Sequence, residues 1–418
     1  MAEKKQNGHY ITVDESREIA RSNAREIKAL QKRRAAFTRD DYVTTMKDPN
    51  NIVEFDDLHT YFYTDNGVVK AVNGVSFNIP INSTVGVVGE SGCGKSVTSM
   101  SVMRLLQGPT GQIVSGSIRF KAEDFKRDEK GKPIPVYERD ENGEVVCAPV
   151  LDKKGNPKLD KNGEQILKPV QKTRENGIGI YETEEKIFDI AKMPIKQMYK
   201  LRGRQMSMVF QEPMTSLNPV FTIGDQLDEV SLLHIPDATK EIAKNRSIEM
   251  LNMVGIAMPE RVYASYPHEL SGGMRQRVMI AMALAGEPRL IIADEPTTAL
   301  DVTIQAQILE LLADLRKETG MSIILVTHNL GIVSEMADRV CVMYAGRIVE
   351  TAPVRELIDR PRHPYTTALL AAVPKLGGEH GKLSTIPGSV PTPAHFPAGC
   401  RFCDRCALSQ REREERAL

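Results

Sequence analysis

Residues 89–96, GESGCGKS, form the clearest chemical motif in the chain. They fit the pattern GxxxxGK(S/T), in which glycines let backbone N–H groups converge on phosphate oxygens. A helix N-terminus after the loop would add partial positive charge. Lys95 is predicted to bridge the β- and γ-phosphates, and Ser96 to offer its hydroxyl to Mg²⁺. The residues predicted to hold a nucleotide here are Gly89, Glu90, Ser91, Gly92, Cys93, Gly94, Lys95 and Ser96.

Two carboxylates follow an apolar segment, LIIA at 290–293. A carboxylate at the C-terminal edge of a parallel strand is well placed to hold Mg²⁺ beside a phosphate loop. Asp294 fits that magnesium role. Glu295, the next residue, can then polarise the attacking water.

A third motif, LSGG at 270–273, is followed by a basic helix that begins MRQR. With it the sequence resembles the ATP-binding cassette (ABC) family of transporter ATPases. Further family elements match in order. Gln211 resembles the Q-loop glutamine, Asp301 the D-loop aspartate and His328 the switch histidine. Phe62 occupies the place of the adenine-stacking aromatic, with Tyr61 and Tyr63 as neighbouring alternatives.

The resemblance implies a mechanism in which two cassettes close head-to-tail around two ATP molecules. Ser271, Gly272 and Gly273 would contact the γ-phosphate of the nucleotide held by the partner cassette. Glu295 would orient or deprotonate water, and His328 would bridge to the γ-phosphate. Gln211 would sense the γ-phosphate and Mg²⁺. None of these motifs is degenerate, so the chain is expected to hydrolyse ATP.

The elements that must position these residues alternate between strands and helices, which predicts a parallel α/β core. Strands are expected at 84–89, 290–293, 322–326 and 339–344, and helices from the phosphate loop to about Leu106 and over about 223–286. The pair Asn66-Gly67 between two β-rich runs predicts a hairpin. The resemblance implies a P-loop NTPase fold with a RecA-like parallel-sheet core, an antiparallel β subdomain and a helical subdomain. The expected organisation is an extension (1–50), the cassette (51–350), a charged insertion inside it (123–182) and a regulatory tail (351–418).

The extension and the insertion lie outside the resemblance. Thr12 and Glu15 have capping-box spacing before a helix with a basic end, which is expected to pack on its own domain. In the insertion 25 of 60 residues are charged, and four turn-like units have Gly at their fourth position. This pattern favours hairpins, or a partly disordered loop. We hypothesise that the insertion contacts a partner subunit or regulates assembly.

Segments outside the nucleotide motifs narrow the family match. Residues 211–227, 266–284, 363–374, 386–393 and 397–402 resemble the oligopeptide/dipeptide importer ATPases. This group implies a second, different cassette subunit, two transmembrane permeases and an external solute-binding protein. The chain would then lie at the cytoplasmic face of the membrane as a peripheral subunit. Nickel or another small solute is the alternative cargo.

Cys400, Cys403 and Cys406 form C-x2-C-x2-C near the end of the sequence. Cysteines at this spacing can hold one metal or cluster, and some related importer subunits carry an iron–sulfur cluster in this region. A [4Fe-4S] cluster and free thiols are therefore both open. A fourth ligand is missing, unless Cys147 or a partner supplies it.

Composition excludes several other classes. The 55 Lys and Arg balance 55 Asp and Glu, so overall basic charge cannot drive binding to nucleic acid. No apolar run approaches the roughly 20 residues that span a bilayer. A soluble cassette protein acting on DNA or the ribosome is the alternative of another class. It is disfavoured by the single cassette and by the importer-like tail.

Overall fold

The computed structural model describes residues 12–152, 155–174, 176–211, 216–297, 301–372, 385–394 and 396–417. The chain divides into two compact units. Unit 1 comprises residues 1–121, 187–212 and 288–418, and unit 2 comprises residues 122–186 and 213–287. No helix among the described residues is long and apolar enough to cross a membrane.

A six-stranded sheet with strand order β12-β11-β3-β10-β9-β8 forms the core of unit 1. All neighbours are parallel except β12 and β11 at one edge. β3, β9 and β10 are buried along their whole length, as expected for apolar strands covered on both faces. The strands are β3 (Thr84–Val88), β8 (Met206–Val209), β9 (Leu290–Asp294), β10 (Ser322–Thr327), β11 (Arg339–Tyr344) and β12 (Arg347–Pro353).

An antiparallel sheet has the order β2-β1-β4-β7. Its strands are β1 (Asn51–Thr64), β2 (Gly67–Pro80), β4 (Gly111–Phe125) and β7 (Thr183–Asp189). Thr64 pairs with Gly67, so only Asp65 and Asn66 form the turn between β1 and β2. The predicted Asn-Gly hairpin is therefore confirmed. The parallel core and this sheet confirm two of the three predicted parts of the fold.

The remaining elements of unit 1 are helices. They are α1 (Val13–Ala35), α2 (Arg39–Tyr42), α3 (Lys95–Met103), α4 (Ile195–Met198), α10 (Val302–Thr319), α11 (Leu330–Met336), α12 (Val354–Asp359), α13 (Pro364–Ala371), the short 3-10 helix η2 (Cys403–Arg405) and α14 (Ala407–Ala417). α3 ends three residues before the predicted Leu106, where Arg104 adopts a left-handed conformation with φ 52°.

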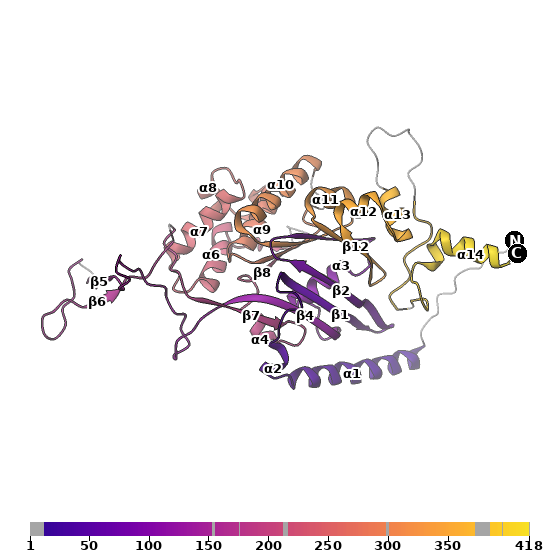
Figure 1. The fold of residues 1–418 in the computed structure, drawn as a ribbon, viewed down its shortest axis with the longest axis horizontal. Helices are drawn as coiled ribbons and strands as arrows, with labels where there is room; N and C mark the ends of the chain where they lie inside the picture. The colour runs from indigo at the N-terminus through magenta and orange to yellow at the C-terminus, as the bar shows by residue number, and fades with distance from the viewer. Residues whose placement is uncertain are drawn as a thin grey trace. The chain divides into compact units, whose positions relative to one another are not determined.

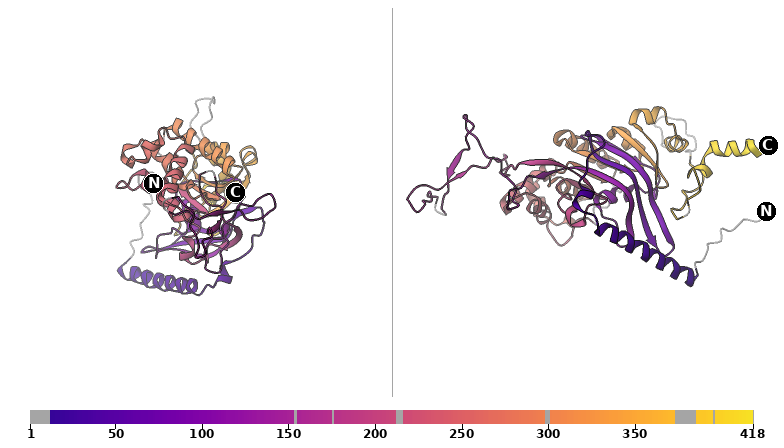
Figure 2. Two further views of the ribbon diagram at one scale, coloured as in Figure 1. Left: turned by 90° about the vertical axis from the view of Figure 1, so that its left-hand side faces the viewer. Right: turned by 60° about the horizontal axis from the view of Figure 1, so that its bottom comes forward.

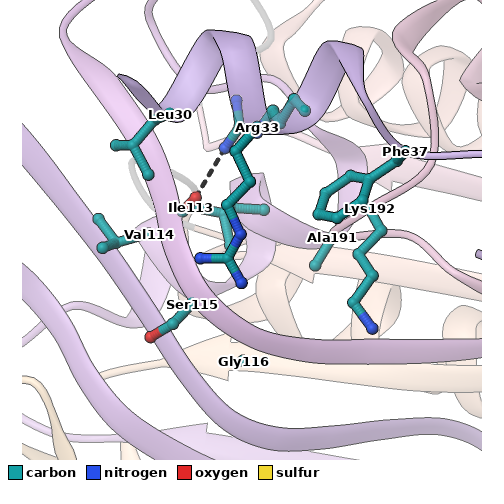
Figure 3. A pocket seen from close by; sticks show the side chains of 10 residues that line it. Leu30, Arg33, Phe37, Ile113, Val114, Ser115, Gly116, Ala191 and Lys192 are labelled. Atoms are coloured by element: carbon teal, nitrogen blue, oxygen red, sulfur yellow. Dashed lines mark hydrogen bonds between the residues drawn. The ribbon is translucent and has the colours of Figure 1, made fainter. Parts of the chain in front are cut away.

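Helix α1 begins with the predicted capping box. The Glu15 N–H donates to Thr12 Oγ1 (3.3 Å), and the Thr12 N–H donates to the Glu15 carboxylate (2.8 Å). The helix runs along the antiparallel sheet (Figures 1 and 2). Arg34 donates to the carbonyl of Ile113 (2.8 Å) inside a pocket that Leu30 and Phe37 also line (Figure 3). The extension thus packs on its own unit, as predicted.

Unit 2 contains the predicted helical segment and the insertion. Its helical elements are α6 (Ile223–His234), α7 (Lys240–Met253), α8 (Pro259–Tyr263), the 3-10 helix η1 (Pro267–Glu269) and α9 (Gly272–Leu284). Asp228 of α6 ties the helices together, because it accepts hydrogen bonds from Ser247 of α7 (2.5 Å) and Tyr263 of α8 (2.6 Å).

The insertion is a branched set of hairpins. Asp128, Asp140, Asp152 and Asp160 each begin a tight turn whose fourth residue is a glycine with φ between 79° and 85°. Between the turns, three backbone segments meet and donate to one another in a ring. Glu138 donates to Val170, Val170 to Val146 and Val146 to Glu138, each at 2.9 Å. The predicted hairpins are confirmed. Two short segments between the turns form β5 (Cys147–Pro149) and β6 (Leu167–Pro169), which pair in antiparallel orientation.

Candidate active site

The phosphate loop joins the buried end of β3 to the first residue of α3. Gly89 has φ 153°, and a Cβ built on it would lie 2.1 Å from the carbonyl oxygen of Met343. Gly94 has φ 106°, and its Cβ would lie 2.4 Å from the carbonyl oxygen of Ala71. Both positions therefore need glycine for lack of space as well as for backbone conformation. The loop is packed tightly against β2 and β11.

Lys95, Ser96 and Asp294 make the contacts expected of a phosphate and metal site. The buried Lys95 donates from Nζ to the carbonyl oxygens of Gly89 (2.9 Å) and Glu90 (3.1 Å), so its ammonium lies along the loop. Ser96 Oγ donates to Asp294 Oδ1 (3.0 Å). Burial raises the pKa of Asp294, and the hydrogen bond from Ser96 partly offsets this. A hydroxyl and a buried carboxylate that converge in this way suit a hard cation such as Mg²⁺.

Glu295 lies between Gln211 and His328. Gln211 Nε2 donates to Glu295 Oε2 (3.1 Å), and His328 Nδ1 lies 3.1 Å from Glu295 Oε1. The three residues follow β8, β9 and β10, which are neighbours in the sheet and run parallel. Their side chains meet because parallel strands end at the same edge. The side chain of Glu295 is 13% exposed and that of His328 is 58% exposed, so water can reach this group.

The other predicted site residues belong to other elements. Ser271 forms the N-cap of α9 in unit 2, where its hydroxyl accepts from the Met274 N–H (3.3 Å); Gly272 and Gly273 begin that helix. Asp301 is the N-cap residue of α10. Phe62 lies on β1 beside Gly111, and the Tyr61 hydroxyl donates to Asn73 (3.0 Å). Burial raises the pKa of the Cys93 thiol, which fits a packed loop residue.

Sequence reasoning missed two residues that contact the phosphate loop from the C-terminal part of the chain. The Glu90 N–H donates to the Tyr365 hydroxyl (2.9 Å). Arg405 binds both carboxylate oxygens of Glu90, and it also donates to the Tyr344 hydroxyl (3.3 Å). No motif spacing signals these contacts. Tyr365 does lie in one of the segments that resemble the importer group, whereas Arg405 lies just beyond the last of them.

The cysteine prediction gains no support from the structure. Cys400 is exposed, Cys403 is half-buried and Cys406 is buried. In the described part of the chain, no three His, Cys, Asp or Glu side chains are grouped so that they could hold a metal ion. Cys147, the suggested fourth ligand, is exposed on β5 in the other unit.

Two family models match the chain. The model described as "ABC transporter" matches residues 72–146 and 175–298, which include the phosphate loop, Gln211, the LSGG motif, Asp294 and Glu295. The model described as "Oligopeptide/dipeptide transporter, C-terminal region" matches residues 349–412. Residues 147–174, the outer part of the insertion, fall outside both matches.

Curated relatives match over most of their length. The oligopeptide transport ATP-binding protein AppD of Bacillus subtilis is 44% identical over 85% of this chain and 89% of the relative. The putative peptide import ATP-binding protein BAB2_1052 of Brucella abortus is 42% identical over 86% of this chain and 88% of the relative.

Solved structures share the fold. A dimeric post-hydrolysis state of the ATP-binding cassette MJ0796 bound to ADP and Pi has a TM-score of 0.50 at 22% identity, covering 72% of this chain and 99% of that chain. A second dimeric MJ0796 structure has the same TM-score at 21% identity and the same coverage. With the relatives above, these findings confirm the predicted cassette fold and resemblance: the chain belongs to the ABC transporter family of ATPases.

Proposed function

We propose that this chain is the ATP-binding and ATP-hydrolysing subunit of a membrane importer of oligopeptides or dipeptides. One observation carries the catalytic part. Glu295 is held by Gln211 and His328 directly after Asp294, which is hydrogen-bonded to Ser96 of the phosphate loop. The peptide cargo rests on the C-terminal region and on the names of the relatives.

The phosphate loop and its neighbours bind Mg²⁺–ATP in this proposal. Backbone N–H groups of the loop and the ammonium of Lys95 hold the β- and γ-phosphates. Ser96, Asp294 and Gln211 would hold Mg²⁺, which would neutralise charge on the phosphate oxygens. Phe62 stacks on the adenine. Asp301 lies beside the nucleotide at the partner cassette.

Hydrolysis then needs a base and a group that holds the γ-phosphate. The oxygen of a water molecule attacks the γ-phosphorus, and the bond to the ADP oxygen breaks. Glu295 accepts the proton of that water, and Gln211 and His328 keep its carboxylate in position. His328 also donates to a γ-phosphate oxygen. The positioned carboxylate supplies the general-base share of the rate, about 10²–10⁴-fold.

The assembly completes the site. The LSGG motif of this chain, through Ser271, Gly272 and Gly273, contacts the nucleotide of a second, different cassette subunit. The LSGG motif of that subunit completes the nucleotide site of this chain. Two transmembrane permeases and an external solute-binding protein form the rest of the importer. The chain is a peripheral subunit at the cytoplasmic face of the membrane. Residues 51–350 are the cassette, and 351–418 are its regulatory tail.

A Glu295→Gln substitution tests the catalytic assignment. The variant should bind Mg²⁺–ATP with nearly unchanged affinity and hydrolyse it at least 100-fold more slowly, because an amide cannot accept the proton. Glu310→Gln, an exposed change on α10, is the matched control and should retain the normal rate. Hydrolysis by Glu295→Gln at near-normal rate would show that another group acts as the base.

Purification of the assembled complex tests the transport part. The chain should co-purify with permeases and a second cassette, and the associated solute-binding protein should bind di- or oligopeptides. Binding of nickel by that protein would change the cargo and leave the ATPase assignment intact. Recovery of ribosomes or DNA without a permease would overturn the importer proposal.

A further inference from the structure

Glu90, the second residue of the phosphate loop, forms a bidentate ion pair with the C-terminal tail. Arg405 Nη1 lies 2.7 Å from Glu90 Oε2, and Arg405 Nη2 lies 3.0 Å from Glu90 Oε1. The two residues are 315 positions apart in the sequence. The side chain of Arg405 is only 6% exposed and that of Glu90 29%, so solvent screens this pair less than a surface pair. Two parallel charge-assisted hydrogen bonds also fix the direction of the Glu90 side chain.

Arg405 is itself held rigidly. Its Nε donates to the carbonyl of Pro387 (2.7 Å), and its Nη1 also donates to the Tyr344 hydroxyl (3.3 Å). The rings of Tyr344, Tyr365 and Phe402 are almost completely buried and pack together, with centroids 4.6–5.4 Å apart. These three rings pack β11, α13 and the segment around Phe402 against one another. The position from which Arg405 contacts Glu90 is therefore fixed.

A second contact joins the same loop residue to one of these three rings. The Glu90 N–H donates to the Tyr365 hydroxyl at 2.9 Å. Both the backbone and the carboxylate of Glu90 are thus bound by groups outside the loop. Without Arg405, the carboxylate would carry an unpaired negative charge inside a loop that must accept a triphosphate. This charge would repel the phosphate groups and weaken the binding of the nucleotide.

We propose that residues 385–394 and 396–406 of the tail belong to the nucleotide-binding machinery, with Arg405 as a positioning residue that pairs with the Glu90 carboxylate and holds it so that the phosphate loop can accept ATP. The inference rests on the proposed ATPase function. It assigns to the importer-type C-terminal region a direct effect on ATP affinity. Arg405 touches no reacting atom, so its loss should alter binding and leave the chemical step nearly unchanged.

The test compares Arg405→Met with the wild-type full-length chain. Arg405→Met should raise the KM for ATP about tenfold, equivalent to about 1.4 kcal/mol, with kcat within twofold. Equilibrium titration with a fluorescent ATP analogue should show the same loss. Arg362→Met is the matched control, because Arg362 pairs with Glu356 (2.6 Å) and is 80% exposed. It should leave the KM unchanged.

A double variant distinguishes the effect of Arg405 on the Glu90 carboxylate from a general stabilisation of the fold by Arg405. Adding Glu90→Gln to Arg405→Met removes the unpaired charge and should recover most of the lost affinity, although no contact is restored. An unchanged KM in Arg405→Met would overturn the inference. So would a raised KM that Glu90→Gln does not rescue, since Arg405 would then only brace the fold. If the wild-type chain bound no ATP, the proposed function itself would fail, which is a different result.

Discussion

Glu295 illustrates how single residues are held for chemistry in this chain. It has φ 47°, a left-handed conformation that costs a non-glycine residue about 1–2 kcal/mol. The hydrogen bond from its N–H to the carbonyl of Val326 (2.8 Å) holds this conformation at the end of β9. The carboxylate consequently turns toward Gln211 and His328. The catalytic geometry therefore depends on the backbone of β10 as well as on three side chains.

Two glycines of the phosphate loop give a residue-scale prediction. Gly94→Ala should destabilise the chain by about 3 kcal/mol and abolish ATP binding, because its Cβ would lie 2.4 Å from the Ala71 carbonyl oxygen. Gly92→Ala is the matched control. Gly92 also has a positive φ (77°), but a Cβ there meets nothing within 4 Å, so the loss should be only about 1–2 kcal/mol. Urea unfolding and ATP titration would measure both, and equal losses would contradict the steric argument.

Residue types at fixed spacing indicated which side chains meet at the ends of β8, β9 and β10. Ser96, Asp294, Gln211, Glu295 and His328 were named from the sequence, and the structure brings Ser96 to Asp294 and the other three together. Their roles stay predictions until the variants are measured. The contacts of Tyr365 and Arg405 could not be predicted in this way. They depend on the packing of three buried rings from distant segments, and no local pattern encodes that packing.

At the scale of elements, the sequence predicted the features that a few neighbouring residues determine. A capping box begins α1, and a two-residue turn joins β1 to β2. The positions of β3, β9, β10 and β11 followed from short apolar runs, whereas β8 and β12 were not predicted. Residues 385–394 and 396–402 were harder to predict, because they form no helix or strand and are held by side-chain contacts such as the hydrogen bond from Arg405 to the Pro387 carbonyl.

Helix α13 carries an acid-sensitive cap. His363 Nδ1 accepts the hydrogen bond of the Tyr365 N–H (3.1 Å), a role that only the neutral ring can fill. Burial lowers the pKa of His363, although Glu350 acts in the opposite direction. Between the folded and the unfolded pKa, the His363 ring therefore binds a proton in the unfolded chain and stays neutral in the folded chain. The stability that this difference provides is complete above the ordinary pKa of about 6.5, and it is lost as the pH falls toward the folded pKa.

Thermal unfolding at about pH 7.5 and about pH 5.5 would measure this effect. The midpoint should fall on acidification, and His363→Asn, which keeps a capping acceptor without a titrating group, should show a fall smaller by a few degrees. His268→Asn, at an exposed position in unit 2, is the control and should behave as the wild type. An equal fall in all three proteins would mean that His363 does not set the acid sensitivity.

At the scale of the whole molecule, the net charge of zero is an average over parts that differ in composition and structure. The cassette fold needs a parallel sheet, an antiparallel sheet and a helical unit, and all three are present. The branched hairpins of the insertion add a surface that this fold does not require. Residues 147–174 lie outside the family model, and several of their apolar side chains are exposed, including Leu151, Leu159 and Leu167. We therefore propose that this outer part contacts another subunit of the importer.

Excision of the outer hairpins tests that proposal. The Val170 N–H donates to the carbonyl of Val146 at 2.9 Å, so residues 147–169 can be replaced by an Asn-Gly turn without moving either end. The unfolding midpoint and the ATPase rate of the isolated chain should stay unchanged, because the excised residues include none of the predicted nucleotide-site residues. Recovery of the complex with the permeases should fall at least tenfold. A full-length variant with Leu151, Leu159 and Leu167 changed to Ser should show a similar loss if the contact is apolar. Complex recovery and transport at the wild-type level in the excised chain would show that the insertion makes no subunit contact.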